Sequence, residues 1–219
     1  MKQIKKIKLV VMISGEGTNL QALIDAQKEK KINTQIMAVI SDNKYAYGIK
    51  RAKKNNIPTF IFDQRNFDTK DEFYLNISRE IKKINPDLIV LAGFMKILNK
   101  DFINAFPYKI LNIHPSILPK FKGLNTHKRA LESGVKYHGA TVHFVEEDLD
   151  SGPIIMQYKL AVNKNDDEEI LKNRVHKGEY LILVETIKLF IMKDLKIDNN
   201  SIIIDGVPLH NPILYEESI

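Results

Sequence analysis

The stretch "KLVVMISGEGTNLQALIDAQKEK", Lys8 to Lys30, decides the fold. It opens with a continuous apolar run that ends at a glycine, a pattern typical of a short strand buried on both faces of a parallel sheet. Beyond the glycine-rich turn, apolar side chains recur at helical spacing. They are Leu20, Leu23, Ile24 and Ala26. This stretch therefore predicts one strand, a tight turn and one helix.

The same alternation continues to residue 93. The further strands that we predict are 34–41, 57–63 and 86–93, and the helices between them are 46–56 and 69–85. Thr69, with Glu72 three residues on, has the pattern of a capping box at the start of a helix. Four strands alternating with three helices favour an α/β fold, namely a single-domain, doubly wound, mostly parallel, Rossmann-like sheet.

The second half of the chain predicts an antiparallel part. Two strand-like runs, 137–148 and 153–162, are separated by a short turn, as in a hairpin. The other predicted elements are a strand at 110–114, helices at 126–134 and 166–192, and a small hairpin and loose end in the tail. We predict one domain over 1–195, with halves of about 1–105 and 106–195, and a C-terminal extension, 196–219, packed on it.

Composition excludes several classes of protein. The 219 residues include no cysteine, so disulfides and thiolate zinc sites are excluded. No apolar run is long enough for a transmembrane helix. The basic start of the chain leads into the first strand, and we interpret it as part of that strand and not as a signal peptide. The net charge of +6 favours anionic partners, although scattered lysines are more typical of a solvated surface than of a nucleic-acid site.

The glycine turn, Gly15 to Asn19 in "SGEGTNL", is a candidate phosphate site. Small residues allow close approach of a ligand, and the helix that follows offers free N–H groups and a positive dipole end. The dinucleotide-binding fingerprint is incomplete because Leu20 stands where a third glycine would be, and no P-loop is formed. The alternative is a tight turn that uses glycine for structural reasons alone.

Polar residues end the strand 110–114. Asn112 and His114 have strand spacing and therefore project from the same face, at the rim where parallel sheets bind ligands. Asn112 could stabilise an oxyanion, and His114 could donate a proton near neutral pH. Asp148 and Asp150, before Gly152, could supply a carboxylate that orients the histidine and raises its pKa. Strand capping and turn chemistry are the alternatives for these residues.

Other chemistries are disfavoured. The histidines His138 and His143 lack the spacing of a zinc-binding helix, so we predict no metal site and interpret them as hydrogen-bonding residues of turns and strands. The sequence also has no G-x-S-x-G elbow, which excludes the serine nucleophile of the α/β-hydrolases.

Five motifs occur in the chain in this order: "SGEGTNL", "LAGFMKIL", "LNIHPSILPKFKG", "HGATVHFV" and "DLDSGPII". In combination they resemble the phosphoribosylglycinamide formyltransferases, which are folate-dependent enzymes of purine synthesis. The resemblance covers about residues 8–191. The resemblance implies the formyltransferase fold and a catalytic group of Asn112, His114 and Asp150. It implies that substrate is bound by Gly15, Glu16, Gly17, Thr18, Asn19 and Glu179. It implies that folate is bound by Lys70, Met95, Lys96, Ile97, Leu98, Asn112, Ala140, Thr141, Val142, His143 and Asp150, within the loop from Ala140 to Asp150.

Four positions depart from the family pattern. Lys70 and Lys96 stand where arginines are frequent near the folate tail, so the charge is kept and the bidentate fork is lost. Lys122 and Asn125 replace a proline and a histidine that are common in "PGLHTH". We expect the two lysines to affect affinity for the folate tail. We expect the changes at Lys122 and Asn125 to tune activity and not to abolish it, because neither is in the catalytic group.

The reaction implied is direct formyl transfer from 10-formyltetrahydrofolate, as co-substrate and without metal, to the amine of glycinamide ribonucleotide. The partners implied are these small molecules, with no nucleic acid and no membrane, in the cytoplasm; a homodimer is left open. The alternatives are formyltetrahydrofolate hydrolase and methionyl-tRNA formyltransferase, which carry further domains that we expect to be absent here. A non-catalytic protein that binds nucleotide phosphate is a third alternative.

Overall fold

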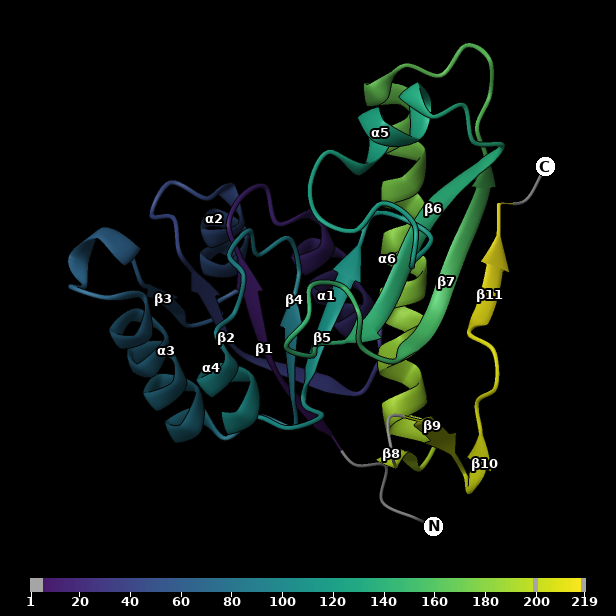
Figure 1. Cartoon of the computed structure of the whole chain (residues 1–219). Helices are drawn as coiled ribbons and strands as arrows, with labels where there is room; N and C mark the ends of the chain where they lie inside the picture. Colours follow the sequence, from purple (N-terminus) through teal and green to yellow (C-terminus); the bar gives the residue numbers. More distant parts are fainter. Residues whose placement is uncertain (1–5, 199–200, 218–219) are drawn as a thin grey trace. The chain divides into compact units, whose positions relative to one another are not determined.

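A computed structural model describes residues 6–198 and 201–217 (Figure 1). The expected strand at the basic start of the chain thus lies partly outside the described residues. The chain forms two compact units, Met1–Leu111 and Asn112–Ile219. The sequence placed its two halves on either side of residue 105, and the idea that residues 1–195 act as one catalytic domain stays a prediction.

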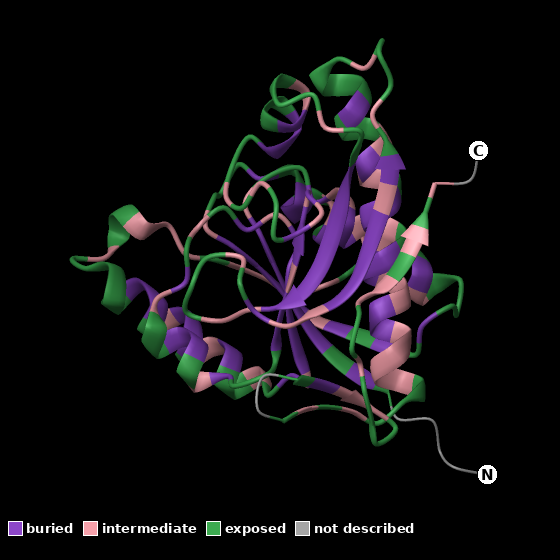
Figure 2. Cartoon of the chain, turned by 45° about the vertical axis from the view of Figure 1, so that its right-hand side comes forward, coloured by how far each residue is buried: buried purple, intermediate pink, exposed green. Residues whose placement is uncertain are grey.

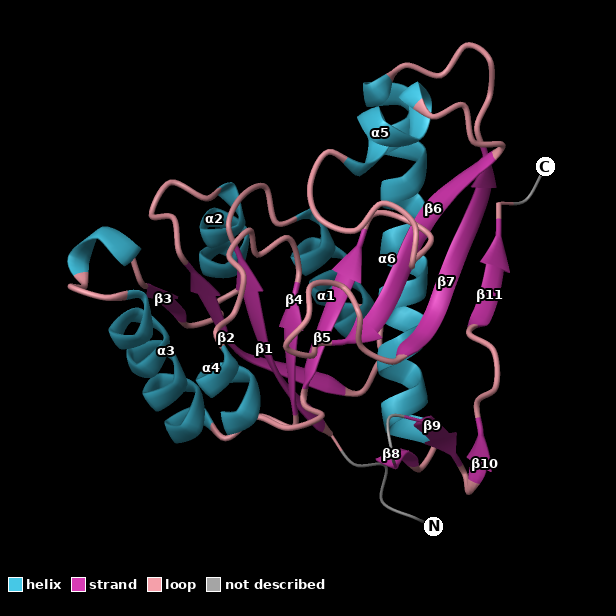
Figure 3. Ribbon diagram, in the orientation of Figure 1, coloured by secondary structure: helices cyan, strands magenta, loops and turns pink. Residues whose placement is uncertain are grey.

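The first unit is an alternation of strands and helices (Figure 3). Its elements are β1 (Ile7–Ile13), α1 (Thr18–Lys28), β2 (Thr34–Ser41), α2 (Tyr47–Lys54), β3 (Thr59–Ile61), η1 (Gln64–Asn66), α3 (Lys70–Ile84), β4 (Leu88–Leu91) and α4 (Lys100–Ala105). Its four strands lie in the order β4-β1-β2-β3, and every neighbouring pair is parallel. The α/β prediction from the apolar runs is confirmed.

Burial in this unit follows the sequence pattern. The central strand β1 is fully buried from Leu9 to Ile13, as a strand covered on both faces must be. The predicted cap of α3 also forms, because the Thr69 hydroxyl accepts the backbone N–H of Glu72 at 3.0 Å. The Glu72 carboxylate reaches back to the N–H of Asp68, one residue before the cap. Local capping chemistry therefore sets where this helix begins.

The second unit contains the predicted hairpin. Its elements are β5 (Ile110–His114, which begins in the first unit), α5 (Thr126–Glu132), β6 (Tyr137–Phe144), β7 (Ile154–Ala161), α6 (Glu168–Met192), β8 (Leu195–Asp198), β9 (Ser201–Ile204), β10 (Val207–Pro208) and β11 (Ile213–Glu216). Strands β6 and β7 pair antiparallel, as predicted. The inner strands of this unit are mostly buried (Figure 2).

The tail differs in part from the prediction. The small hairpin forms, since β9 pairs antiparallel with β10, and β8 adds a further antiparallel strand beside β9. The expected loose end, however, is a strand, because β11 pairs in parallel with β7. Lys159 of β7 forms an ion pair with Glu216, and Arg174 of α6 forms another with Glu217. These partners are far from the tail in the sequence, so local pattern could not reveal the strand.

Helix α6 packs against β6 and β7, and a glycine permits the contact. A Cβ at Gly178 would lie only 1.9 Å from Cδ1 of the Tyr158 ring, so no larger residue fits without displacement. The next residue, Glu179, is 4% exposed and has an interacting partner. The close packing at Gly178 thus fixes the position of this predicted substrate-binding carboxylate on the helix.

Candidate active site

The glycine turn of the first unit is shaped by its neighbour α2. Gly17 has a left-handed backbone (φ +68°), and a Cβ there would lie 2.6 Å from the Gly48 Cα atom. The Gly48 N–H donates to the Gly15 carbonyl at 3.1 Å. By contrast, a Cβ at Gly15 would meet no heavy atom of the described chain within 4 Å. Gly17 therefore has a structural reason to be glycine, whereas Gly15 faces open space.

The turn is held rigidly to the end of β4. The Ser14 N–H donates to the Gly93 carbonyl at 3.0 Å, and the Ser14 hydroxyl accepts the Met95 N–H at 2.8 Å. On the other side, the Arg51 guanidinium donates to the Glu16 carbonyl at 2.8 Å. Within α1, all of whose residues are described, the first turn carries no acidic side chain. The turn thus presents a preorganised, positive helix end.

The predicted substrate residues Thr18 and Asn19 open helix α1, and Asn19 is buried. The predicted folate segment follows β4, and its apolar side chains Met95 and Ile97 are 63% and 59% exposed. The Ile97 carbonyl accepts the Tyr74 hydroxyl at 2.7 Å, which fixes this segment to α3. Two large exposed apolar side chains on a fixed loop are a surface on which a flat apolar ring could pack.

The two lysines predicted near the folate tail lie in the same unit. Lys70 is exposed at the start of α3, with its ammonium 5.8 Å from the centre of the Tyr74 ring. Lys96 is half-buried in the segment after β4. A lysine ammonium does not provide the bidentate fork of an arginine, so both side chains act as single positive charges.

In the second unit, the three predicted catalytic side chains come together. The Asn112 amide nitrogen lies 3.4 Å from Oδ1 of Asp150, and Nδ1 of His114 lies 3.4 Å from Oδ2 of Asp150. His114 is 5% exposed, and the Asp150 side chain is 7% exposed. Asn112 and His114 project from one face of β5, as their spacing predicted. The contacts that the sequence suggested for this group are present.

The hydrogen-bond partner of His114 fixes the place of one ring proton. Its Nε2 lies 2.9 Å from the Phe121 carbonyl oxygen, which can only accept, so Nε2 carries a proton. Its Nδ1 lies 3.4 Å from Oδ2 of Asp150, within ion-pair distance. A second proton, on Nδ1, would therefore give a positively charged ring beside a carboxylate.

A fourth side chain, His143 of β6, belongs to this group. Its Nδ1 donates to the Phe144 carbonyl at 2.7 Å, so its Nε2 is left as an acceptor for the Asn112 amide at 3.2 Å. Burial lowers the pKa of His143 to about 4, which keeps the ring neutral and able to accept. This pairing orients the Asn112 amide with its N–H groups toward His143 and Asp150. The sequence indicated hydrogen bonding by His143 but gave no signal for this partner.

Asp150 is held in a strained conformation. Its backbone is left-handed (φ +48°), which is unusual for a residue with a side chain. Its Oδ2 accepts the Gly123 N–H at 2.8 Å, a contact between two loops that the sequence did not reveal. Nearby, a Cβ at Gly152 would lie 2.1 Å from the Phe144 carbonyl oxygen. Packing of the turn around these glycines thus aims the carboxylate at His114.

The remaining predicted folate residues lie on β6. Ala140, Thr141 and Val142 are fully buried. The Thr141 hydroxyl donates to the Ser116 carbonyl and accepts two N–H groups, so its hydrogen-bonding capacity is used within the protein. Any contact of this residue with folate would have to come from its backbone.

The two departures near "KGLNTH" also have a place in the structure. Asn125 caps α5 with a left-handed backbone (φ +56°), which asparagine tolerates well. The Lys122 carbonyl accepts the Arg129 guanidinium at 2.6 Å, so the backbone here is held whatever the side chain. Both positions fit the local structure.

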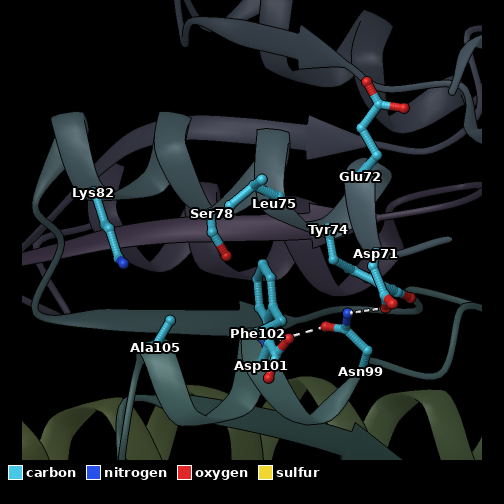
Figure 4. Close-up of a pocket in the computed structure, with 10 residues that line it drawn as sticks. All are labelled: Asp71, Glu72, Tyr74, Leu75, Ser78, Lys82, Asn99, Asp101, Phe102 and Ala105. Atoms are coloured by element: carbon cyan, nitrogen blue, oxygen red, sulfur yellow. Dashed lines mark hydrogen bonds between the residues drawn. The ribbon is translucent and has the colours of Figure 1, made fainter. Parts of the chain in front are cut away.

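A hollow of about 370 Å³ lies in the first unit between α3 and α4 (Figure 4). At one end of this hollow, the Asn99 amide donates a hydrogen bond to the Asp71 carboxylate at 2.8 Å. Leu75 and Phe102 contribute apolar surface. Its lining residues belong to neither the glycine turn nor the Asn112 group. Among the described residues, His, Asp and Glu side chains form no cluster suited to a metal ion, and no helix is long and apolar enough to cross a membrane.

A family model described as "Formyl transferase" matches residues 7–187. The chain belongs to the formyl transferase family. This formyl transferase is 45% identical over 202 residues to the phosphoribosylglycinamide formyltransferase of Haemophilus influenzae, which covers 92% of this chain and 95% of the relative. It is 42% identical over 198 residues to that of Escherichia coli, with 90% and 93% covered.

The fold of the formyl transferase has a solved counterpart. The phosphoribosylglycinamide formyltransferase (purN) from Coxiella burnetii, in complex with CHES, superimposes with a TM-score of 0.92 and 43% identity, over 96% of this chain and 100% of that chain. The family and the fold class expected from the motifs are both confirmed.

Buried histidines should make the formyl transferase sensitive to mild acid. His127, His138 and His143 are each at most 8% exposed, and burial lowers their pKa values to about 3, 4 and 4. An unfolded histidine has a pKa near 6.5, so the unfolded chain binds more protons than the native one between pH 6.5 and 4. Stability present above pH 6.5 is therefore lost as the pH falls, by up to about 1.4 kcal/mol per pH unit per histidine.

Urea unfolding at pH 7, 6 and 5 measures this loss. The variant His127→Asn should flatten the pH dependence, whereas removal of the exposed His210 should not. Equal unfolding midpoints at the three pH values would contradict the expectation.

Proposed function

We propose that this protein transfers the formyl group of 10-formyltetrahydrofolate to the amine of glycinamide ribonucleotide, giving formylglycinamide ribonucleotide and tetrahydrofolate in de novo purine biosynthesis. The observation that carries the proposal is the contact network of Asn112, His114 and Asp150 in a chain 42–45% identical to named phosphoribosylglycinamide formyltransferases. A protein that only binds phosphate would not need this buried polar group.

Stabilisation of the tetrahedral intermediate is the role that suits Asn112 and His114. Attack of the amine on the formyl carbon turns its carbonyl oxygen into an oxyanion. The Asn112 amide already donates to His143 and, over a longer 3.4 Å, to Asp150. The oxyanion would replace the longer of these contacts. His114 would add a positive charge when it is protonated, because the Phe121 carbonyl holds its Nε2–H group and the Asp150 carboxylate lies 3.4 Å from its Nδ1.

Proton transfer is the role that suits Asp150. The attacking amine must lose a proton, and the departing folate nitrogen must gain one. A carboxylate that is mostly shielded from solvent can accept the first through a water molecule and return it to the leaving nitrogen. Because the Gly123 N–H donates to Oδ2 at 2.8 Å and His114 Nδ1 lies 3.4 Å from the same oxygen, the Asp150 carboxylate is held in place to act as the acceptor. No covalent intermediate with the enzyme is required.

The glycine turn is the proposed site of the substrate phosphate. Its support is the positive helix end, the rigid attachment to Met95, and the open space beside Gly15. The exposed Met95 and Ile97 side chains would pack on the folate ring. Glu179, buried on α6, would bind the substrate amine or hydroxyl groups. The implied partners are small molecules, and a cytoplasmic location follows from the proposed pathway.

The experiment mixes the protein with 10-formyltetrahydrofolate, with and without glycinamide ribonucleotide, and follows folate deformylation by absorbance. We expect turnover only when the ribonucleotide is present, with formylglycinamide ribonucleotide as product. Deformylation of equal rate without the ribonucleotide would indicate a hydrolase. If folate is deformylated without ribonucleotide and no formate is released, neither the transferase nor the hydrolase activity explains the result.

The two glycines of the turn give a separate prediction. Gly15→Val places methyl groups in space that the protein does not occupy, so the fold should persist while phosphate binding suffers. We expect the KM for the ribonucleotide to rise by about 100-fold or more, since close approach to backbone N–H groups is lost, with a much smaller rise in the KM for folate.

Gly17→Val is the contrasting variant. It would force a β-branched residue into a left-handed conformation against Gly48, so it should lower stability instead. Steady-state kinetics for each substrate and urea unfolding distinguish the two effects. Equal changes of both KM values in Gly15→Val would argue against phosphate binding at this turn.

A further inference from the structure

A buried polar cluster lies beside the catalytic group and takes no part in the mechanism above. It joins Gln157 of β7, Thr141 of β6 and Ser116 of the loop after β5. These side chains are 9%, 0% and 0% exposed. Buried polar side chains that satisfy one another fix a unique local geometry, and breaking the set is costly. The cluster therefore fixes the backbone segment to which its side chains bond.

The cluster holds the loop 115–121, which follows His114 at the end of β5. The Gln157 amide donates to the Leu118 carbonyl at 2.9 Å and to the Thr141 hydroxyl at 3.1 Å. That hydroxyl accepts the Leu118 N–H at 3.1 Å and donates to the Ser116 carbonyl at 2.6 Å. Both amide hydrogens of Gln157 and all three hydrogen-bonding positions of the Thr141 hydroxyl are used.

The loop delivers the acceptor that His114 needs. The Ser116 N–H donates to the His114 carbonyl at 2.9 Å, and the Ser116 hydroxyl donates to the Lys120 carbonyl at 2.6 Å. The next residue, Phe121, supplies the carbonyl oxygen that accepts Nε2–H of His114 at 2.9 Å. A shift of the loop would therefore move this oxygen away from the imidazole ring.

We propose that Gln157, acting through Thr141 and the loop 115–121, is a positioning residue for His114. It never contacts the reacting atoms. It keeps the Phe121 carbonyl where it fixes the ring orientation of His114 and stabilises the imidazolium form, as a buried acceptor does for a functional histidine elsewhere. This inference rests on the proposed function of His114.

The test replaces Gln157 by leucine, which keeps a similar volume and removes both donors. We expect kcat and kcat/KM to fall together, by about 10- to 100-fold, with the KM values for both substrates nearly unchanged. The alkaline limb of the pH profile should move to lower pH, because loss of an acceptor disfavours the charged ring. Long-range ¹H–¹⁵N spectra of labelled histidine should show a changed Nε2 environment at His114.

Thr141 provides a second pair of variants if Gln157→Leu fails to fold. Thr141→Val removes the hydroxyl with little change of shape and should reproduce the kinetic loss. Thr141→Ser keeps the hydroxyl and should retain most of the wild-type turnover. The double variant of Gln157→Leu with Thr141→Val should lose less than the sum of the single losses, because the two side chains act on one loop.

Thr186→Val is the matched control. Thr186 is also fully buried, but its hydroxyl contacts the sulfur of Met156 at 3.9 Å and does not contact the loop. It should change stability without changing the pH profile. The proposal is overturned if Gln157→Leu and Thr141→Val keep kcat within about twofold and leave the His114 spectrum unchanged, or if Thr186→Val changes kinetics equally.

The wild-type protein separates this proposal from the function itself. Absence of ribonucleotide-dependent transfer by the wild type would refute the proposed reaction. The spectrum of His114 would still report on whether Gln157 positions the ring.

Discussion

Replacement of His114 by alanine should lower kcat by at least about two orders of magnitude, while the protein still folds. The ring lies between Asp150 on one side and the Phe121 carbonyl on the other, so its orientation toward the proposed oxyanion is set before the reaction begins. Removal leaves Asn112 as the remaining donor of the pair. Single-turnover deformylation with saturating ribonucleotide measures the chemical step directly.

Folding of this variant needs its own measurement, because His114 is buried and its loss leaves a small cavity. Circular dichroism and urea unfolding establish how much native protein is present. His210→Ala, at an exposed position, controls for the loss of a histidine as such. A folded His114→Ala protein with near wild-type turnover would remove His114 from the mechanism.

Asp150→Asn should have an effect of similar or larger size, about 10²- to 10⁴-fold on kcat, because it removes the proposed proton acceptor. The change keeps the shape of the side chain, so substrate KM values should move little. The substitution also replaces one acceptor oxygen by a donor nitrogen. The Asn112 amide donates to Oδ1 and His114 Nδ1 lies 3.4 Å from Oδ2, so an amide in place of the carboxylate would turn an N–H group toward one of these nitrogens. The imidazolium would also lose its counter-charge.

Asp148 supplies the matched control in the same turn. Its side chain is exposed, and its backbone carbonyl accepts the Ser151 hydroxyl at 2.8 Å. Asp148→Asn removes one negative charge two residues away and should keep nearly full activity. If both variants lose activity equally, the charge of the turn matters and a specific role for Asp150 is refuted. If neither loses activity, proton transfer runs through another group.

Much of the fold could be predicted because it depends on local chemistry. The apolar run of β1, followed by Gly15, indicated a buried parallel strand, and Thr69 with Glu72 indicated where α3 begins. Asn112 and His114 were found by their two-residue spacing at a strand end. The family resemblance implied that Asp150 joins them, and the structure brings the three side chains together. The role of each in catalysis stays a prediction for the experiments above.

Other features needed the folded chain. The tail strand β11 depends on β7, more than 50 residues away in sequence, as the register of Tyr215 with Tyr158 shows. The acceptor of His114 is a backbone carbonyl, at Phe121, and side-chain types in a sequence carry no information about which carbonyl is nearby. Thr141 was expected at the folate, but its hydroxyl is used to hold a loop.

The amino-acid sequence by itself determined most of the strand and helix pattern and the glycine turn, because periodicity and capping act over a few neighbouring residues, and its motifs indicated three candidate catalytic side chains. The tertiary structure alone decided the hydrogen-bond partners that give those side chains their charge and orientation, His143 for Asn112 and the Phe121 carbonyl for His114. Such partners are brought together by packing between strands and loops, and distance along the chain does not predict distance in space.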